Sequence, residues 1–173
     1  GVDAVYLTPI YRSSTYHRYD VVDHMEVDPL LGGVRDFKEM LERLHQEGIR
    51  VVLDLVAHHT SPCSKFFVDA LTRGRSSKYW DWYLFKVNDL GDVAREEYEA
   101  VLNFIRSNCR GGVKLPGKSP FYEAFANSWL MPKLNHENEE VAKYLEEVID
   151  YWIGMGVDGF RVDVANAIPD SSL

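Results

Sequence analysis

Apolar residues recur along the chain in two patterns, which predict strands and helices in alternation. Short β-branched and aromatic runs at residues 3–10, 49–59 and 158–165 are typical of strands. Apolar side chains spaced three or four positions apart at residues 34–48 and 138–156 predict amphipathic helices between them. Because a strand, a crossover helix and a second strand form a right-handed unit with parallel strands, the pattern predicts an α/β fold.

Each predicted helix has an end signal. Gly48 and Gly156 follow the last apolar positions, where glycine commonly ends a helix. Asn138 is the predicted N-cap of the second helix, and the two glutamates after it suit the positive end of the helix dipole. The apolar stripes are expected to consist of Phe37, Met40, Leu41 and Leu44 in the first helix and of Val141, Leu145, Val148 and Trp152 in the second.

Two stretches break the alternation. Residues 14–33 are polar and aromatic with turn residues, and we expect a long loop there. Residues 60–133 hold aromatic clusters, a predicted helix at 92–108 and a Gly/Pro-rich piece, which is too much for a loop between two strands. We therefore divide the chain into residues 1–59, an inserted subdomain at 60–133, and residues 134–173.

Composition and charge narrow the class of protein. With 173 residues, of which 46% are hydrophobic, the chain can form one domain with a sizeable core. The formal net charge of −8 argues against a nucleic-acid partner, because phosphate binding needs clustered lysine and arginine. No apolar run approaches the length of a membrane span, so we expect no membrane partner.

Two cysteines, Cys63 and Cys109, lie far apart in the sequence. They could pair in an oxidising compartment, but two isolated cysteines are more often free thiols, and free thiols are what we expect. The sequence leaves the pairing and the compartment open, with the cytoplasm slightly favoured.

Charged side chains gather where the parallel strands are predicted to end, which is where sites lie in such folds. Asp54 is followed by His58 and His59, and Asp163 closes the third strand two residues after Arg161. Because side chains alternate along a strand, Arg161 and Asp163 point the same way and are expected to form an ion pair that tolerates burial. A neighbouring guanidinium favours the ionised carboxylate, which is the form a glycosidase uses to attack a sugar carbon.

Structural interpretations compete with this one. An Arg-x-Asp pair on a strand is often only a structural ion pair. The adjacent His58 and His59 could suggest zinc, but neighbours on an extended segment point to opposite sides and no metal-ligand spacing accompanies them, so no metal is predicted. No Gly-rich nucleotide motif and no G-x-S-x-G motif supports nucleotide binding or serine hydrolase chemistry.

Several short segments, in order, resemble the α-amylase family of glycoside hydrolases. "DLVAHHTS", "MPKLN" and "GFRVDVANA" resemble three of its signature regions, and "GVDAVYLTPI" and "YHRYDVVDHMEVDPLLGG" resemble its second barrel strand and the loop that follows. "MPKLN" and "VAN" are most similar to the neopullulanase, cyclomaltodextrinase and maltogenic amylase branch. The resemblance implies a partial (β/α)8 TIM barrel, about strands two to four, with an inserted subdomain between the third strand and the third helix.

The resemblance also implies roles for individual residues. Asp163 matches the catalytic nucleophile, and Arg161 matches the arginine that supports it. The residues expected to contact the sugar are Tyr19, His17, His59, Asn166 and Trp129, with Asp54 and Asp20 in structural roles at the site.

The implied partner is an α-glucan oligosaccharide or polysaccharide, and no cofactor is expected. His58 stands where the family usually has an asparagine that often helps to bind calcium, which argues against calcium there. Ala167 stands where the branch commonly has glutamate, so the preference for α-1,4 or α-1,6 bonds is left open.

A barrel of this kind needs eight strands and about 250 residues, whereas this chain predicts three strands. The general-acid glutamate of the family would lie beyond residue 173, so we expect a piece of a retaining α-glucan hydrolase that is inactive alone. Bare strand edges predict a homo-oligomer. The alternative is a non-catalytic amylase-like carbohydrate-binding or scaffold module, although such relatives usually lose the nucleophile.

Overall fold

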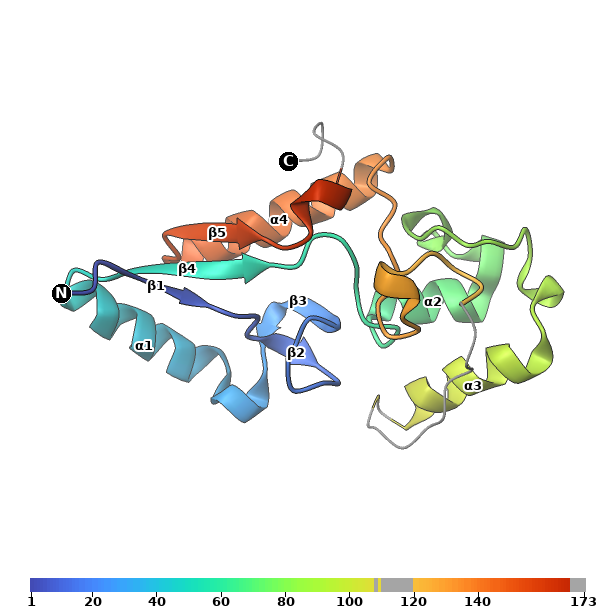
Figure 1. Ribbon diagram of the computed structural model, residues 1–173, viewed down its shortest axis with the longest axis horizontal. Coiled ribbons are helices and arrows are strands. Elements are labelled where there is room, and N and C mark those ends of the chain that lie inside the picture. Colours follow the sequence, from blue (N-terminus) through green and yellow to red (C-terminus); the bar gives the residue numbers. More distant parts are fainter. Residues whose placement is uncertain (108, 110–119, 169–173) are drawn as a thin grey trace.

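A three-stranded parallel sheet forms the centre of the protein. The computed structural model describes residues 1–107, 109 and 120–168. The strands β1 (Ala4–Leu7), β4 (Arg50–Leu55) and β5 (Gly159–Val162) lie in the order β1-β4-β5. Figure 1 shows α1 (Gly33–Gln46) alongside β1 and α4 (Glu139–Met155) alongside β5. The predicted element order and the parallel sheet are confirmed.

The central strand is the most buried of the three, as its continuous apolar sequence predicts. Val51 and Leu53 are fully enclosed: β1 and β5 pair with both edges of β4, and α1 packs against the strand. The register places Asp54 directly beside Arg161 across the β4–β5 pair. This pairing brings two charges from distant parts of the sequence to the same end of the sheet.

Helix α4 follows its sequence signals closely. The Asn138 side chain accepts a hydrogen bond of 2.9 Å from the backbone N–H of Glu140, and Gly156 ends the helix with φ +107°, a conformation that favours glycine. All four residues of the predicted stripe are buried: Val141, Leu145, Val148 and Trp152. The Trp152 indole also donates to the carbonyl of His24 at 2.8 Å, which ties the helix to the hairpin described next.

The long loop expected at residues 14–33 is wrong in part. This stretch contains β3 (Val21–Val27), which pairs antiparallel with β2 (Tyr11–Ser13), and it ends in the 3₁₀ helix η1 (Pro29–Leu31). In β3 the buried positions are Val21, His24 and Val27, three apart, because the register shifts along the pair. A spacing of three conceals a strand from any test for alternation.

Residues 60–133 contribute no strand to the parallel sheet within the part that the structure describes. Their elements lie beyond the C-terminal ends of the strands (Figure 1): α2 (Lys65–Arg73), α3 (Arg95–Arg106), and the 3₁₀ helices η2 (Gly74–Ser76), η3 (Trp80–Trp82), η4 (Leu90–Asp92) and η5 (Phe125–Asn127). Helix α3 was predicted from the sequence, and α2 was not. A last 3₁₀ turn, η6 (Ala165–Ala167), follows β5. No helix among the described residues is long and apolar enough to span a bilayer.

The expectation of two free thiols is wrong for this structure. Cys63, just before α2, and Cys109, just after α3, form a disulfide with their Cα atoms 6.2 Å apart. The fold brings the start of α2 next to the end of α3, a proximity that a separation of 46 residues does not reveal.

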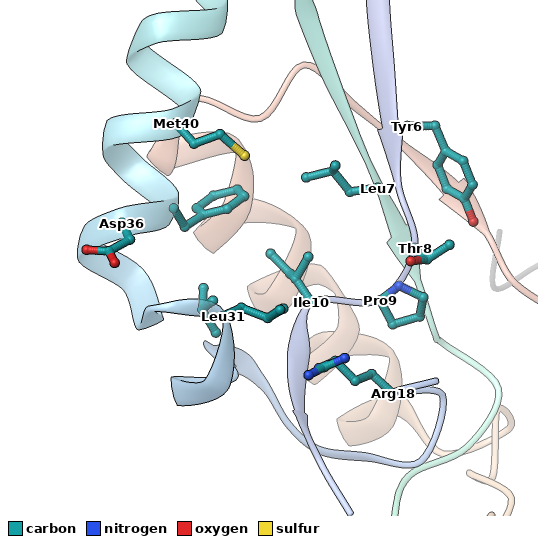
Figure 2. A pocket seen from close by; sticks show the side chains of 11 residues that line it. Tyr6, Leu7, Thr8, Pro9, Ile10, Arg18, Leu31, Asp36 and Met40 are labelled. Atoms are coloured by element: carbon teal, nitrogen blue, oxygen red, sulfur yellow. The ribbon is translucent and has the colours of Figure 1, made fainter. Parts of the chain in front are cut away.

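An open cavity of about 500 Å³ lies between β1 and α1 (Figure 2). Leu7 and Ile10 line it from the strand side, and Leu31 and Met40 line it from the side of η1 and α1. Leu31 is 46% exposed. The outer edge of β1 therefore adjoins apolar surface that no described part of the chain covers.

Candidate active site

Arg161 holds two carboxylates together at the C-terminal end of the sheet. Its Nη1 donates to Asp163 Oδ1 at 2.7 Å and to both carboxylate oxygens of Asp54 at 3.1 and 3.2 Å. The first contact follows from the two-residue spacing along one face of the chain, and the second follows from the β4–β5 register. The predicted pair of Arg161 and Asp163 is therefore present, and a third charge joins it.

The burial of these charges differs from the prediction. The Arg161 side chain is 49% exposed and that of Asp163 is 14% exposed, whereas that of Asp54 is completely buried. The charge that needs compensation is thus the one on Asp54. Arg161 reaches it from the solvent side and leaves Asp163 at the edge of the site.

Tyrosine hydroxyls supply the remaining hydrogen bonds to Asp54. Tyr6 and Tyr19 both donate to its carboxylate, the latter at 3.0 Å, and Tyr11 donates to its carbonyl at 2.7 Å. Burial and the Asp54 charge raise the pKa of Tyr6 and of Tyr19 above the ordinary value, so both hydroxyls keep their protons. Asp54 therefore fixes Tyr19 and Arg161 in position, which agrees with a structural role.

Four predicted residues line one pocket of about 290 Å³: His17, Tyr19, His59 and Asp163, together with Phe125 and Met131. His59 Nε2 lies 3.0 Å from the carbonyl oxygen of Tyr19, which can only accept, so this nitrogen carries the proton. The contact joins the end of β4 to the loop before β3.

The two adjacent histidines are uncharged at neutral pH. Burial, with a contribution from His58, lowers the pKa of His59 to about 3. Burial, with contributions from Lys133 and His136, lowers the pKa of His58 to about 4. Their Nδ1 atoms lie 3.2 Å apart, and since His59 is protonated on Nε2, His58 is the donor between them. His59 therefore presents a neutral ring to the pocket.

Asp20 and His17 shape the turn that carries Tyr19. The buried Asp20 carboxylate accepts hydrogen bonds from the hydroxyls of Ser13, Ser14 and Thr15. His17 Nδ1 accepts from the backbone N–H of Tyr19 at 3.1 Å. These contacts hold the segment over the end of the sheet.

Phe125 and Met131, which the sequence analysis did not select, form a wall from the inserted region. The Phe125 ring is 37% exposed and stacks on His59, with ring centroids 5.5 Å apart and planes 17° from parallel. The nearby signature "MPKLN" was a signal that could have drawn attention to Met131 and to the aromatic residue six positions before it.

Two of the residues predicted to contact the sugar lie outside this pocket. Trp129, expected as a sugar platform, is 6% exposed and packs its ring on Phe121 and Tyr122, so the structure gives it a core position. Asn166 is exposed in η6, beyond Val164, whose left-handed conformation (φ 53°, ψ 34°) turns the chain away after Asp163. A β-branched residue in that conformation is strained, and such strain is often found beside functional residues.

The chemistry of the pocket suits a sugar ring beside a carboxylate. Tyr19 and Phe125 offer aromatic faces for apolar ring faces, and Asp163 offers an oxygen nucleophile. Among the residues that the structure describes, no three His, Cys, Asp or Glu side chains are grouped so that they could hold a metal ion.

Comparison with known proteins gives consistent matches along the chain. The family described as "Alpha amylase, catalytic domain" matches residues 1–173. A cyclomaltodextrinase of Thermoanaerobacter pseudethanolicus is 39% identical over 170 residues, which are 97% of this chain and 25% of that protein. Neopullulanase 2 of Thermoactinomyces vulgaris is 33% identical over 168 residues, again 97% of this chain and 25% of that protein.

A solved structure agrees with this pattern. The maltogenic amylase from S. marinus matches with a TM-score of 0.85 and 39% identity, covering 99% of this chain and 25% of that one. The chain thus spans about a quarter of the length of these similar proteins.

Proposed function

Because the chain belongs to the α-amylase family of glycoside hydrolases, we propose that it is part of a retaining α-glucan hydrolase whose nucleophile is Asp163. The predicted family and the partial α/β barrel are confirmed. The observation that carries the proposal is the position of Asp163, at the edge of an aromatic pocket and bonded to Arg161 at 2.7 Å.

The proposed roles follow from the contacts. Asp163 attacks the anomeric carbon and forms a covalent glycosyl intermediate, which water later hydrolyses. Arg161 holds the carboxylate in position through their 2.7 Å hydrogen bond, while Tyr19 and His59 bind the sugar that is cleaved. The names of the similar proteins, cyclomaltodextrinase, neopullulanase and maltogenic amylase, support an α-glucan as the substrate. We propose that α-1,4 or α-1,6 glucosidic bonds are the bonds cleaved.

We also propose that residues 1–173 alone turn over little or no substrate. A retaining glycosidase needs a second carboxyl group about 5 Å from the nucleophile to protonate the leaving oxygen. Asp163 is the one carboxylate in the described lining of the pocket, and the buried Asp54 is engaged by Arg161 and two tyrosines. The acid would then come from outside the described lining of this pocket.

For domain organisation, we propose that residues 1–59 and 134–173 form the partial barrel and that 60–133 form one inserted unit.

We further propose that the isolated chain self-associates. Each of β1 and β5 pairs with β4 alone among the described strands, and the cavity beside β1 has apolar side chains such as Leu7, Leu31 and Met40 in its lining, together with polar ones (Figure 2). Unpaired edges of this kind readily accept a strand from a second copy.

Hydrolysis of maltooligosaccharides by the natural protein that carries these residues tests the proposal. The Asp163→Asn variant should lose at least about a thousandfold in kcat, because the amide cannot act as the nucleophile. A matched surface variant, Asp89→Asn, should keep full activity, since Asp89 lies in the inserted region outside the pocket. Binding without any hydrolysis by the unchanged protein would instead favour a non-catalytic carbohydrate-binding module.

A further inference from the structure

Arg18 lies between two residues of the Asp163 pocket but does not line that pocket itself. Its neighbours in the chain, His17 and Tyr19, both line it. The Arg18 side chain lies instead at the cavity between β1 and α1 (Figure 2). Neither the proposed mechanism nor the Asp54 cluster uses Arg18. Three consecutive residues are thus divided between two separate cavities.

The backbone of Arg18 has a left-handed conformation, with φ 61°. A positive φ is uncommon and unfavourable for a residue that carries a Cβ atom and is neither asparagine nor aspartate. Such a conformation persists only where the surrounding contacts hold it, and it is often found beside functional residues. The contacts of the Arg18 side chain must therefore offset the cost of this turn.

Two hydrogen bonds from the guanidinium group hold the turn. Arg18 Nε donates to Asp28 Oδ2 at 2.8 Å, and Arg18 Nη1 donates to the carbonyl of Tyr16 at 2.9 Å. The first is an ion pair whose side chains are 17% and 7% exposed, so dissolved salt screens it little. In the same hairpin, the pair of Arg12 and Glu26 is 3.4 Å long and 57% and 40% exposed, and such surface pairs contribute little.

Asp28 is a fixed anchor for Arg18. Its backbone N–H donates to the carbonyl of Ile10 at 2.8 Å. Its other carboxylate oxygen, Oδ1, accepts from the backbone N–H of Leu30 at 2.9 Å and so caps the 3₁₀ helix η1. Because these bonds fix both the backbone and the carboxylate of Asp28, the ion pair ties the loop before β3 to a rigid point just after β3.

We propose that Arg18 is a positioning residue for the substrate: its pair with Asp28 holds the left-handed turn that directs Tyr19 into the Asp163 pocket. Without the pair, Arg18 returns to negative φ, which changes the direction in which the chain presents Tyr19. Arg18 acts on the substrate only through Tyr19, so it controls the affinity for the sugar rather than the attack by Asp163. The nature of the ligand, an α-glucan, rests on the proposed function.

Steady-state hydrolysis of maltotetraose by the natural protein that carries these residues tests the proposal. Arg18→Ala should raise KM about tenfold and change kcat less than about threefold, because a contact that binds the sugar equally in the ground and transition states is weakened. Arg18→Lys should give an intermediate KM, since one ammonium group replaces the two donors of the guanidinium.

A second variant and a control accompany these substitutions. Asp28→Asn should raise KM as Arg18→Ala does, because asparagine still caps η1 but carries no charge for Arg18. Arg12→Ala is the matched control: it removes the exposed ion pair of the same hairpin and should leave KM unchanged. An unchanged KM in both Arg18→Ala and Asp28→Asn overturns the inference.

A Tyr19→Ala background shows whether Arg18 acts through Tyr19. The proposal expects Arg18→Ala to raise KM in the unchanged protein and to have no further effect once Tyr19 is alanine. An equal rise of KM in both backgrounds overturns the inference. A lower kcat with an unchanged KM, which a loss of folded protein alone would give, also overturns it.

Failure of the proposed function gives a different result. Undiminished turnover by Asp163→Asn contradicts the proposed nucleophile, while the KM of Arg18→Ala still decides the role of Arg18. If the natural protein binds maltotetraose without hydrolysing it, the proposed function is contradicted, and the same variants are compared by their Kd from calorimetry. Absence of any binding by the natural protein overturns both.

Discussion

A single buried carboxylate, Asp54, connects the two halves of the candidate active site. It accepts from Tyr6 and Tyr19 on one side and from Arg161 on the other. A buried charge is stable only when such donors are present, which explains why three side chains from separate segments converge there. The position of the Asp163 pocket thus depends on a residue that does not line it.

Removal of one donor measures this dependence. Tyr19→Phe should lower the free energy of unfolding by about 1 to 3 kcal/mol, because a hydrogen bond to a charged group is lost in a partly buried place. Urea unfolding measures the change. Tyr16→Phe is the control, since Tyr16 is 90% exposed and its hydroxyl is not among the described donors to Asp54, and it should unfold like the unchanged chain. Equal stability of the two variants would show that Asp54 does not need the Tyr19 hydroxyl.

His58 and His59 predict a pH dependence of stability, to which His24 and His136 add in the same direction because burial lowers their pKa values too. Their folded pKa values, about 4 for His58 and about 3 for His59, lie below the ordinary 6.5 of the unfolded chain. Below pH 6.5 these histidines therefore take up protons in the unfolded state but stay neutral in the folded state. The free energy of unfolding has its full value above that pH and falls as the pH is lowered toward 4. Each histidine should contribute a slope of up to about 1.4 kcal/mol per pH unit.

Urea unfolding at pH 7, 6 and 5 measures this slope. His58→Asn should flatten it, because one titrating group is removed. An unchanged slope in that variant would contradict the burial of His58 as its cause.

At the residue scale the sequence predicted the ion pair well and the neighbours of the site less well. Arg161 and Asp163 are linked by strand periodicity alone, so spacing was enough. The approach of Phe125 to His59 depends on how the inserted region folds back, which no local pattern contains. Trp129 was selected as a sugar contact but lies in the core, because composition cannot tell a core tryptophan from an exposed one.

Among the elements, helix α4 is the one most fully determined by its own sequence. Its cap, stripe and terminal glycine all have the predicted places. Leu145→Ala should cost about 2 to 5 kcal/mol, because it leaves a cavity in the core, whereas Ile153→Ala on the exposed face should change stability by less than about 0.5 kcal/mol. Thermal or urea unfolding of the pair checks this, and similar losses in both variants would contradict the assigned buried face.

The disulfide links the two longer helices of the inserted region. Because it closes a loop across 46 residues, the loss of Cys63 and Cys109 should reduce stability by about 2 to 5 kcal/mol. Unfolding with and without dithiothreitol measures the effect. A chain with both Cys63→Ser and Cys109→Ser should have the same free energy of unfolding as the reduced chain, and dithiothreitol should not change it. No difference between oxidised and reduced chain would show that the thiols do not pair in solution.

The elements missed by the sequence share a physical cause. Strand β3 buries every third residue through a shifted register, and α2 is a short helix whose apolar face is recognised only against the rest of the inserted region. Tertiary contacts, rather than local periodicity, define both of them. The parallel strands were easier to predict, because each is a short run rich in β-branched and aromatic residues, and the central strand β4 is the most continuously apolar of them.

At the scale of the whole molecule, we expect the unpaired edges of the described sheet to determine the association state in solution. We expect dimers or larger assemblies of the isolated chain at micromolar concentration, since no described part of the chain covers the outer edge of β1 or the cavity beside it. Sedimentation velocity checks this. Leu31→Lys, which places a charge at the cavity, should shift the distribution toward monomer, while Lys38→Glu elsewhere on α1 should not. A monomer in the unchanged chain would contradict the proposed association.

Covalent trapping tests the central claim most directly. The natural protein that carries these residues is treated with a 5-fluoro-α-glucosyl fluoride, whose glycosyl intermediate forms readily and hydrolyses slowly, and the labelled peptide is identified by mass spectrometry. If Asp163 is the nucleophile of a retaining α-glucan hydrolase, the added sugar mass lies on Asp163 and disappears in the Asp163→Asn variant. A label on any other residue, or undiminished turnover by Asp163→Asn, would contradict the assignment.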